Sequence, residues 1–304
     1  MKPEKRKGYN LLASVHTTQI ETMNEYDDTP EYIKNCVNSR FRKKDGGELL
    51  ILNLNRLVGD LFSYHDFTVA FDTVMSEIGI EEYAIKRIDM RFDSYDSDHY
   101  REYQKLNRYL ISMLACAYET KNNYKTDGLF SQRQISVAIK SDDFEIENYD
   151  REVKNQNTGN MTEQAKSRLE ERSKRKDRST VWKVDDLEEI FCKTWFRRWD
   201  RAYKCMNDVQ RRYNEALAKI YYEDKDKKSA VFKSVNEFLR RYQDCIFSSG
   251  QMVALLKRIG VENPQTVAKN FKQRSGIEYF SKTDIKYAID QIKKATLRYF
   301  EKAS

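Results

Sequence analysis

The stretch Phe144-Glu145-Ile146-Glu147-Asn148-Tyr149-Asp150-Arg151-Glu152 is the part of the chain from which the fold can first be inferred. Its residues alternate in character with a period of two, which is typical of a β-strand. A strand places Tyr149 on the face that carries the carboxylates, so this tyrosine is a candidate nucleophile. A half-exposed strand with a solvated outer face is the other interpretation, and the alternation alone favours it.

Two further segments alternate in the same way and also place charge on one face. They are Arg87-Ile88-Asp89-Met90-Arg91-Phe92-Asp93 and Arg168-Leu169-Glu170-Glu171-Arg172, the second within a strand predicted at 165–174. Charges of both signs on a strand often pair across a sheet. Carboxylates spaced along one strand face are also suitable ligands for a hard divalent cation. The pattern leaves both interpretations open.

The composition indicates an ordered protein with a basic bias. Of 304 residues, 34% are charged, and the formal net charge of +7 favours a polyanionic partner over a neutral one. Five cysteines without CxxC spacing and three scattered histidines indicate neither a zinc site nor a histidine-activated nucleophile. No secretory signal and no apolar run of transmembrane length are visible, so we expect a cytoplasmic protein without a membrane partner.

The remaining pattern predicts an α+β fold in two domains. Residues 1–180 should form a catalytic domain in which helices at 66–78 and 97–119 back an antiparallel sheet, and residues 181–304 should be mostly helical. The other predicted strands lie at 11–20, 48–54, 134–139 and 144–150, the last two as a hairpin, with a polar loop at 154–162. The other predicted helices lie at 187–205, 209–222, 231–247, 249–259, 264–271 and 282–300.

The last three predicted helices are separated by short turns near Gly260 and Gly276. Such a unit, at about 247–304, fits a helix-turn-helix that reads DNA and also fits an ordinary helical bundle. Amide and basic side chains suited to bases and phosphates cluster on or just after the second of these helices, namely Gln265, Lys269, Lys272, Gln273 and Arg274.

Four short motifs follow one another between residues 45 and 175. The first is Leu50-Ile51-Leu52-Asn53-Leu54-Asn55-Arg56-Leu57, and the other three are the charged segments around Asp89, Tyr149 and Glu170. In this order and spacing they resemble the Rep_trans family, the rolling-circle replication initiators of small Gram-positive plasmids and their relaxase relatives in conjugative elements.

The resemblance is carried by each motif in turn. The first resembles the family's hydrophobic-x-Phe-Asn-Pro-Asn-Lys-Leu strand end, and the second resembles its Arg-Leu-Asp strand with another Asp four residues on. Ser141 and the strand that reaches Tyr149 resemble Ser-x-x-x-x-Ile-Arg-Ile-Tyr-Asn-Lys-Lys, with Asp150-Arg151 where the family has two lysines. Arg168-Leu169-Glu170 resembles the family's Arg-x-Glu strand.

The resemblance implies a site-specific DNA nickase that joins a 5′ phosphate to Tyr149 and leaves a 3′ hydroxyl for a host polymerase. We expect catalytic roles beside this tyrosine for Arg87, Arg151 and Arg168. The expected partners are origin DNA, as duplex or cruciform and as a single strand, host helicase and polymerase, and a second copy of the chain. A mobilisation relaxase would share the same chemistry.

A bound divalent ion would help this reaction, because a phenol with a pKa of about 10 is only slightly ionised at neutral pH. We expect Mg²⁺ or Mn²⁺ on Asp89, Asp93 and Glu170, whose carboxylates are predicted to face the same polar surface. Two other classes stay open. One is a non-catalytic, sequence-specific DNA-binding protein, and the other is a metal-dependent nuclease that uses water.

Overall fold

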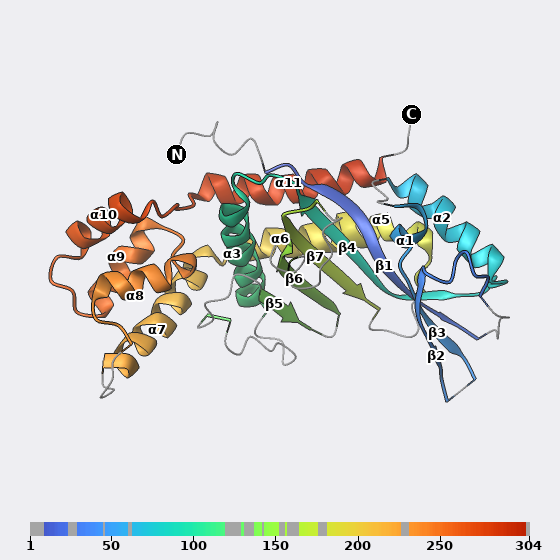
Figure 1. The fold of residues 1–304 in the computed structure, drawn as a ribbon, viewed down its shortest axis with the longest axis horizontal. Coiled ribbons are helices and arrows are strands. Elements are labelled where there is room, and N and C mark those ends of the chain that lie inside the picture. Colours follow the sequence, from blue (N-terminus) through green and yellow to red (C-terminus); the bar gives the residue numbers. More distant parts are fainter. Residues whose placement is uncertain are drawn as a thin grey trace.

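The computed structural model describes residues 9–23, 29–44, 46–59, 63–118, 129–130, 137–141, 143–151, 156, 164–175, 181–225 and 231–301 (Figure 1). They form an elongated molecule in which a curved sheet with helices on one face joins a helical module at one end. The predicted α+β fold, an antiparallel sheet followed by a mostly helical region, is confirmed. No helix in these ranges is long and apolar enough to cross a membrane.

The sheet contains seven strands, and neighbouring strands run antiparallel in the order β2-β3-β1-β4-β7-β6-β5. They are β1 (Leu12–Thr22), β2 (Val37–Arg42), β3 (Glu48–Leu52), β4 (Ala84–Ser94), β5 (Val137–Lys140), β6 (Phe144–Asp150) and β7 (Ser167–Lys174). These bounds agree with the predicted strands to within a few residues. Residues 134–136 of the predicted hairpin, and the predicted loop 154–162 apart from residue 156, lie outside the described residues.

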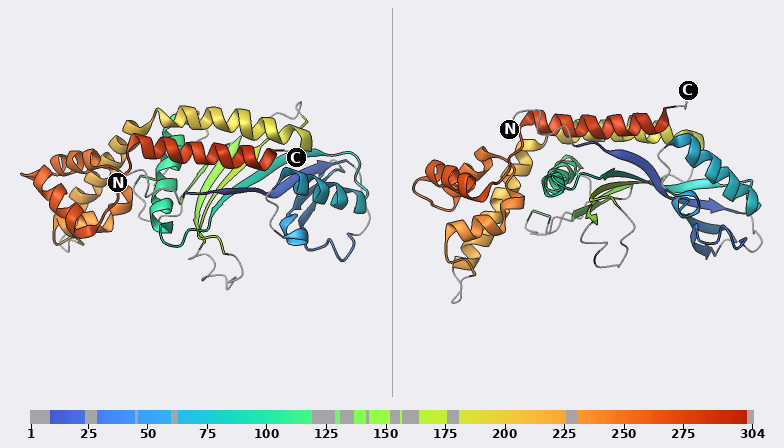
Figure 2. Two further views of the ribbon diagram at one scale, coloured as in Figure 1. Left: turned by 90° about the horizontal axis from the view of Figure 1, so that it is seen from above. Right: turned by 45° about the horizontal axis from the view of Figure 1, so that its top comes forward.

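One face of the sheet is covered by helices (Figure 2). They are α2 (Tyr64–Glu77), α3 (Tyr100–Tyr118), α5 (Leu187–Glu189), the π-helix η3 (Ile190–Trp195), α6 (Phe196–Tyr203) and α11 (Lys282–Phe300). The alternation in the sequence explains why the helices cover this face. The side chains of β4, β6 and β7 on this face include Met90, Ile146 and Leu169, which are all buried. Most charged side chains of the same strands therefore point to the other face, and Glu171 of β7 is an exception on the helix-covered face.

The ends of these helices are set by local sequence. Ser63 caps α2, because its side chain accepts a hydrogen bond from the backbone N–H of Asp66 at 3.1 Å. Gly79 follows α2 with a φ of 68°, a conformation that glycine adopts without a steric penalty. Ser281 and Asp284 form a capping box that starts α11.

The helical module consists of α7 (Met206–Lys225), α8 (Val235–Arg241), α9 (Ser249–Arg258) and α10 (Pro264–Ser275). Helix α3 lies between this module and the sheet (Figure 1). On its module side, the Arg108 guanidinium donates to the Tyr213 hydroxyl at 3.0 Å, and the rings of Tyr109 and Phe247 stack with centroids 4.3 Å apart. On its sheet side, Asn107 donates to Asn148 at 3.0 Å. Helix α3 therefore connects the two parts through buried contacts.

Two features of the helical region differ from the sequence-based predictions. The helix predicted at 231–247 is replaced by α8 and the short 3-10 helix η4 (Gln243–Cys245), because Ser234 caps a later start by accepting from Glu237. The last helix of the predicted trio, α11, leaves the module and packs on β1, α6 and α2. Helices from both sides of residue 180 thus pack on the same sheet, so the packing does not follow the predicted boundary.

The buried carboxyl of Glu171 gives the fold a pH dependence. Glu171 lies on the helix-covered face of β7, and its Oε1 accepts a hydrogen bond from Trp199 Nε1–H at 2.9 Å. Burial raises the pKa of this carboxyl from the ordinary value of 4.5 to about 8. Between these pH values the folded chain keeps a proton that the unfolded chain has lost. The free energy of unfolding should therefore fall as the pH rises through this window.

Glu171→Gln is expected to remove this part of the pH dependence, because the amide keeps the hydrogen-bond acceptor but carries no ionisable proton. At pH 8 the variant should gain stability on the order of a few kcal/mol over wild type, as measured by urea denaturation. Below about pH 4.5 the two proteins should be similar. The exposed Glu262 gives a matched control, Glu262→Gln, which should titrate like wild type. Parallel pH curves for wild type and Glu171→Gln would contradict the assignment.

Candidate functional site

The sheet face opposite the helices carries an ordered array of charged side chains. Antiparallel register aligns them in rows across β6, β7 and β4: Tyr149, Arg168 and Asp93, then Glu147, Glu170 and Arg91, then Glu145, Arg172 and Asp89. Arg87 on β4 lies opposite Lys174 on β7 in the next row. We call this surface the charged face. It brings together the predicted nucleophile, the predicted metal ligands, Arg87 and Arg168.

The Tyr149 hydroxyl lies between a carboxylate and a guanidinium. It donates a hydrogen bond to Glu147 Oε2 at 2.5 Å and accepts one from Arg172 Nη2 at 2.7 Å. Burial raises the pKa of the phenol above its ordinary value, Glu170 and Glu147 raise it further, and Arg172 acts against them. The phenol is therefore protonated at neutral pH. An acceptor for its proton lies beside it, together with a cation that would stabilise the phenolate.

Arg172 is the centre of the carboxylate-rich part of the charged face. Its guanidinium nitrogens lie close to four carboxylates, which are those of Glu145 at 2.5 Å, Glu170 at 2.7 Å, Glu147 at 3.3 Å and Asp89 at 3.7 Å. Burial lowers the pKa of Arg172, but Glu170, Tyr149 and Asp89 outweigh this effect and raise the pKa above its ordinary value. The alternation of the sequence places Arg172 on the charged face but indicates no role for it. Its link to Glu145 could not be found from spacing, because the two residues lie on different strands.

The three predicted metal ligands are each bound to arginine. Arg168 donates twice to Asp93, at 2.6 and 2.8 Å, and Arg87 donates twice to Asp89, at 2.7 and 2.5 Å. Glu170 is bound to Arg172. Burial raises the pKa of Asp89 to about 6, while Arg87 lowers it. Within the described parts of the chain, no group of three or more His, Cys, Asp or Glu side chains is arranged to hold a metal ion. The divalent ion stays a prediction.

A cation-rich part of the charged face adjoins Tyr149 on its other side. Arg168 lies directly opposite Tyr149, and Arg151 follows two residues after it. Burial and the neighbouring Arg168 lower the pKa of Arg151 to about 10. Such mutual repulsion among guanidinium groups favours binding of an anion, and a phosphodiester would relieve it. Tyr149 is thus placed at the border between a region suited to accept a proton and a region suited to a phosphate.

His16 is a member of this region that sequence reasoning missed. It lies in β1 at an irregularity of register between Val15 and Thr17. Burial, Arg168 and Arg91 together lower the pKa of its imidazole to about 3. The ring is therefore neutral at neutral pH, with Nδ1 3.3 Å from the Thr17 hydroxyl. A bulge of this kind leaves no period-two signal, so the alternation in the sequence did not point to His16.

Helix α3 fixes the backbone beneath the candidate nucleophile. The side chain of Gln104 donates to the backbone carbonyl of Tyr149 at 2.7 Å and accepts from Asn148 Nδ2 at 2.5 Å. Asn107, one turn along, donates to Asn148 and also to the Ser167 hydroxyl at 3.1 Å. These buried contacts hold the ends of β6 and β7 next to each other at the position of Tyr149.

Comparisons of the chain with models of protein families, with curated proteins and with solved structures found no match.

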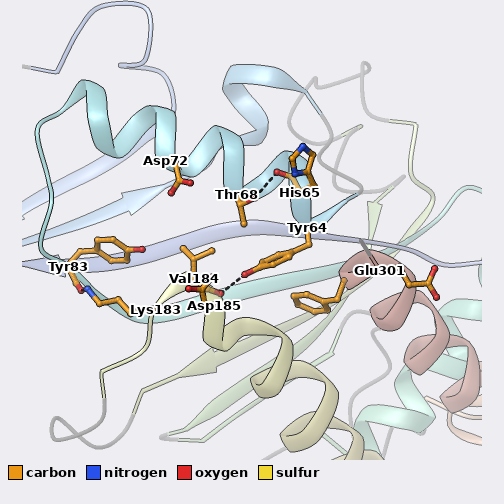
Figure 3. A pocket seen from close by; sticks show the side chains of 10 residues that line it. Tyr64, His65, Thr68, Asp72, Tyr83, Lys183, Val184, Asp185 and Glu301 are labelled. Atoms are coloured by element: carbon orange, nitrogen blue, oxygen red, sulfur yellow. Dashed lines mark hydrogen bonds between the residues drawn. The ribbon is translucent and has the colours of Figure 1, made fainter. Parts of the chain in front are cut away.

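A pocket of about 690 Å³ lies elsewhere, between α2, the 3-10 helix η2 (Val184–Asp186) and the end of α11 (Figure 3). The Tyr64 hydroxyl donates to the Val184 carbonyl at 2.8 Å at its edge, and Lys183 lies over the ring of Tyr83. None of the predicted site residues lines this pocket. We place the candidate site on the charged face, because the candidate nucleophile, the carboxylate that accepts its hydrogen bond and several arginines meet there.

The predicted DNA-binding residues lie exposed on α10. Gln265 and Lys269 are four residues apart and share one side of the helix, which Gln273 continues. Arg274 comes nine residues after Gln265 and therefore points to the opposite side. Lys272 lies 5.2 Å from the centre of the Tyr279 ring. Only part of the predicted cluster thus forms one continuous surface.

Proposed function

We propose that the protein nicks one DNA strand and holds its 5′ phosphate on Tyr149, in the reaction that initiates rolling-circle replication of a plasmid or mobile element. The observation that carries this proposal is the Tyr149 phenol, which donates to Glu147 at 2.5 Å and accepts from Arg172 at 2.7 Å. A phenol needs an adjacent base and a compensating cation in order to attack a phosphodiester. The resemblance to the Rep_trans family supports the same assignment.

The proposed reaction transfers the phosphoryl group from a 3′ oxygen to the tyrosine. The Tyr149 proton passes to Glu147 while the phenol oxygen forms a bond to phosphorus. The bond from phosphorus to the 3′ oxygen breaks, and that oxygen takes a proton from solvent and becomes a hydroxyl. Arg168 lies directly opposite Tyr149, and we assign the contacts with the phosphate oxygens to Arg168 and Arg151. A polymerase could then extend the free 3′ hydroxyl.

The predicted Mg²⁺ or Mn²⁺ would polarise the phosphate if it bound to Asp89, Asp93 and Glu170. In the arrangement described, these carboxylates are bound to arginines, so an ion would have to replace guanidinium contacts at each of them. We therefore assign no step to the ion. Adduct formation in EDTA compared with added Mn²⁺ tests whether the reaction needs it.

The decisive experiment is incubation of the protein with single-stranded oligonucleotides tiled across the replicon that encodes it, followed by a denaturing gel. A protein band that retains labelled DNA after denaturation supports the covalent intermediate. Cleavage without an adduct would indicate that water, and not Tyr149, attacks the phosphodiester. Binding without cleavage would favour a non-catalytic DNA-binding protein, an alternative that the exposed Gln265 and Lys269 of α10 support.

Glu147→Gln is expected to slow adduct formation by roughly 10²–10⁴-fold, because it removes the base that accepts the Tyr149 proton. Single-turnover gel assays measure this rate. The rate of the variant should rise with pH, because hydroxide can then remove the phenol proton in place of the missing carboxylate. Glu145→Gln is the matched control, since Glu145 contacts Arg172 and has no hydrogen bond to the phenol. Equal losses in both variants would rule out Glu147 as the base.

The biological setting of this reaction is proposed on the same basis. A replication initiator would act in the cytoplasm on duplex or cruciform origin DNA, with host helicase and polymerase and a second copy of the chain for a second nick. A mobilisation relaxase would use the same residues. Nicking at a replication origin, as opposed to a transfer origin, distinguishes the two.

A further inference from the structure

A second surface, far from the charged face in the chain, has the features of a ligand site. It is a groove of about 570 Å³ between α7 and α9 in the helical module. Its lining includes three cations, which are Arg211, Lys257 and Arg258, and several side-chain amides, but no carboxylate. Glu215 contacts Arg211 at 3.1 Å and Arg258 at 3.9 Å from outside the lining. These pairs are exposed and therefore weak, so an anion could compete for the guanidinium groups.

One residue of the groove lining, Asn214, carries an unsatisfied hydrogen-bond acceptor. Asn214 is 6% exposed, and its Nδ2 donates to the backbone carbonyl of Gln251 at 3.1 Å. This bond orients the amide, and the Oδ1 atom on its other side is buried with no hydrogen-bond partner among the described residues. A buried acceptor left in this state costs about 1–3 kcal/mol. A donor on a bound ligand would remove that cost.

The size and charge of the surroundings restrict the ligand. Gly250 and Ala254 lie one turn apart on α9, and because both are small they leave space in the groove. A Cβ atom added at Gly250 would meet only the Ser248 hydroxyl, at 3.9 Å. Residues 206–275 contain 14 Lys and Arg against 8 Asp and Glu, which leaves +6 of the chain's net charge of +7 in this module. A ligand with several negative charges and a hydrogen-bond donor fits these features.

We propose that the groove binds a single strand of nucleic acid, with phosphates on Arg211, Lys257 and Arg258 and the exocyclic amine of an unstacked base donating to Asn214. A concave site reached by an unstacked base suits a single strand better than a duplex, whose bases are stacked and paired. This site does not depend on the chemistry at Tyr149. It would give the protein a second DNA-binding surface, whether or not the charged face cleaves the strand.

The proposed contact between a base and Asn214 predicts a preference among bases. Adenine and cytosine carry an exocyclic amine, whereas thymine has none. The wild-type protein should therefore bind oligo(dA) and oligo(dC) more tightly than oligo(dT). Asn214→Leu keeps the shape of the side chain without its acceptor, so it should reduce this preference to near equality while binding to oligo(dT) stays close to wild type. The oligo(dT) affinity thus also reports whether the variant is folded.

The test uses the full chain and fluorescence anisotropy of labelled 15-mers in EDTA. A double variant, Lys257→Gln with Arg258→Gln, changes two exposed side chains and should weaken binding about tenfold or more, with a salt slope reduced by roughly 1–1.5. The matched control is Lys219→Gln with Lys233→Gln, which removes two exposed cations outside the groove lining and should change binding far less.

Three outcomes would overturn the proposal. The double variant could bind with the affinity and salt slope of wild type, or it could bind no more weakly than the Lys219 and Lys233 control. Free dAMP could also compete as well as oligo(dA) at equal nucleotide concentration, which would assign the groove to a mononucleotide. Loss of the base preference in Asn214→Leu, with oligo(dT) binding retained, supports the binding of a single strand in the groove.

Discussion

Replacing Tyr149 with phenylalanine is expected to abolish the covalent protein–DNA adduct and to reduce nicking by at least about 10³-fold. The substitution removes only the phenol oxygen, which is the atom that would attack phosphorus and the one bound to Glu147 and Arg172. Glu147 stays within 3.3 Å of Arg172 without it, so no carboxylate is left without a cation. We therefore expect thermal stability and DNA affinity to stay close to wild type.

A second tyrosine near the charged face provides the control for this prediction. Tyr95 lies close enough to Arg168 to affect its pKa, and it is partly exposed. Tyr95→Phe should form the adduct at the wild-type rate, as seen on a denaturing gel with labelled DNA. A persistent adduct in Tyr149→Phe, together with its loss in Tyr95→Phe, would transfer the nucleophile to Tyr95. Full nicking by Tyr149→Phe without an adduct would indicate hydrolysis by water.

Arg172→Met is expected to destabilise the fold by about 3–5 kcal/mol, because it removes the cation from a largely buried cluster of carboxylates. Arg87 would still bind Asp89, and Lys174 would still bind Glu145 at 3.0 Å. Glu147 and Glu170, which lie directly opposite each other, would lose their shared partner, and like charges in such a pair repel. Urea denaturation at neutral pH measures the loss.

The pH dependence distinguishes charge from packing in this variant. If repulsion among carboxylates causes the loss, the difference in free energy of unfolding between Arg172→Met and wild type should shrink as the pH falls, because protonation removes the repulsion. Arg87→Met, which removes a cation with one carboxylate partner in hydrogen-bond contact, should cost less. A difference in free energy of unfolding that stays constant with pH would mean that Arg172 stabilises the sheet mainly through its aliphatic part. Recovery of stability on adding Mn²⁺ would support the predicted ion.

The placement of Tyr149 could be predicted from sequence because it depends on a local property. Side chains alternate between the two faces of a strand, so one apolar series is enough to assign the opposite face to charge. The same reasoning placed Asp89, Asp93 and Glu170 on that face, and it predicted a helix-backed antiparallel sheet. Helix ends with capping residues, such as the start of α11 at Ser281, were likewise set by nearby residues.

The partners of these residues were decided only by the tertiary structure. Which row contains Tyr149, and which cation lies beside it, depends on the register between β6 and β7, and these strands are joined by a long segment that leaves no periodic signal. The role of Arg172 at the centre of four carboxylates, the His16 bulge and the return of α11 to the sheet all arise from contacts between distant segments. Local alternation fixes the face on which a side chain lies, whereas the free energy of packing the whole sheet and its helices fixes its neighbours.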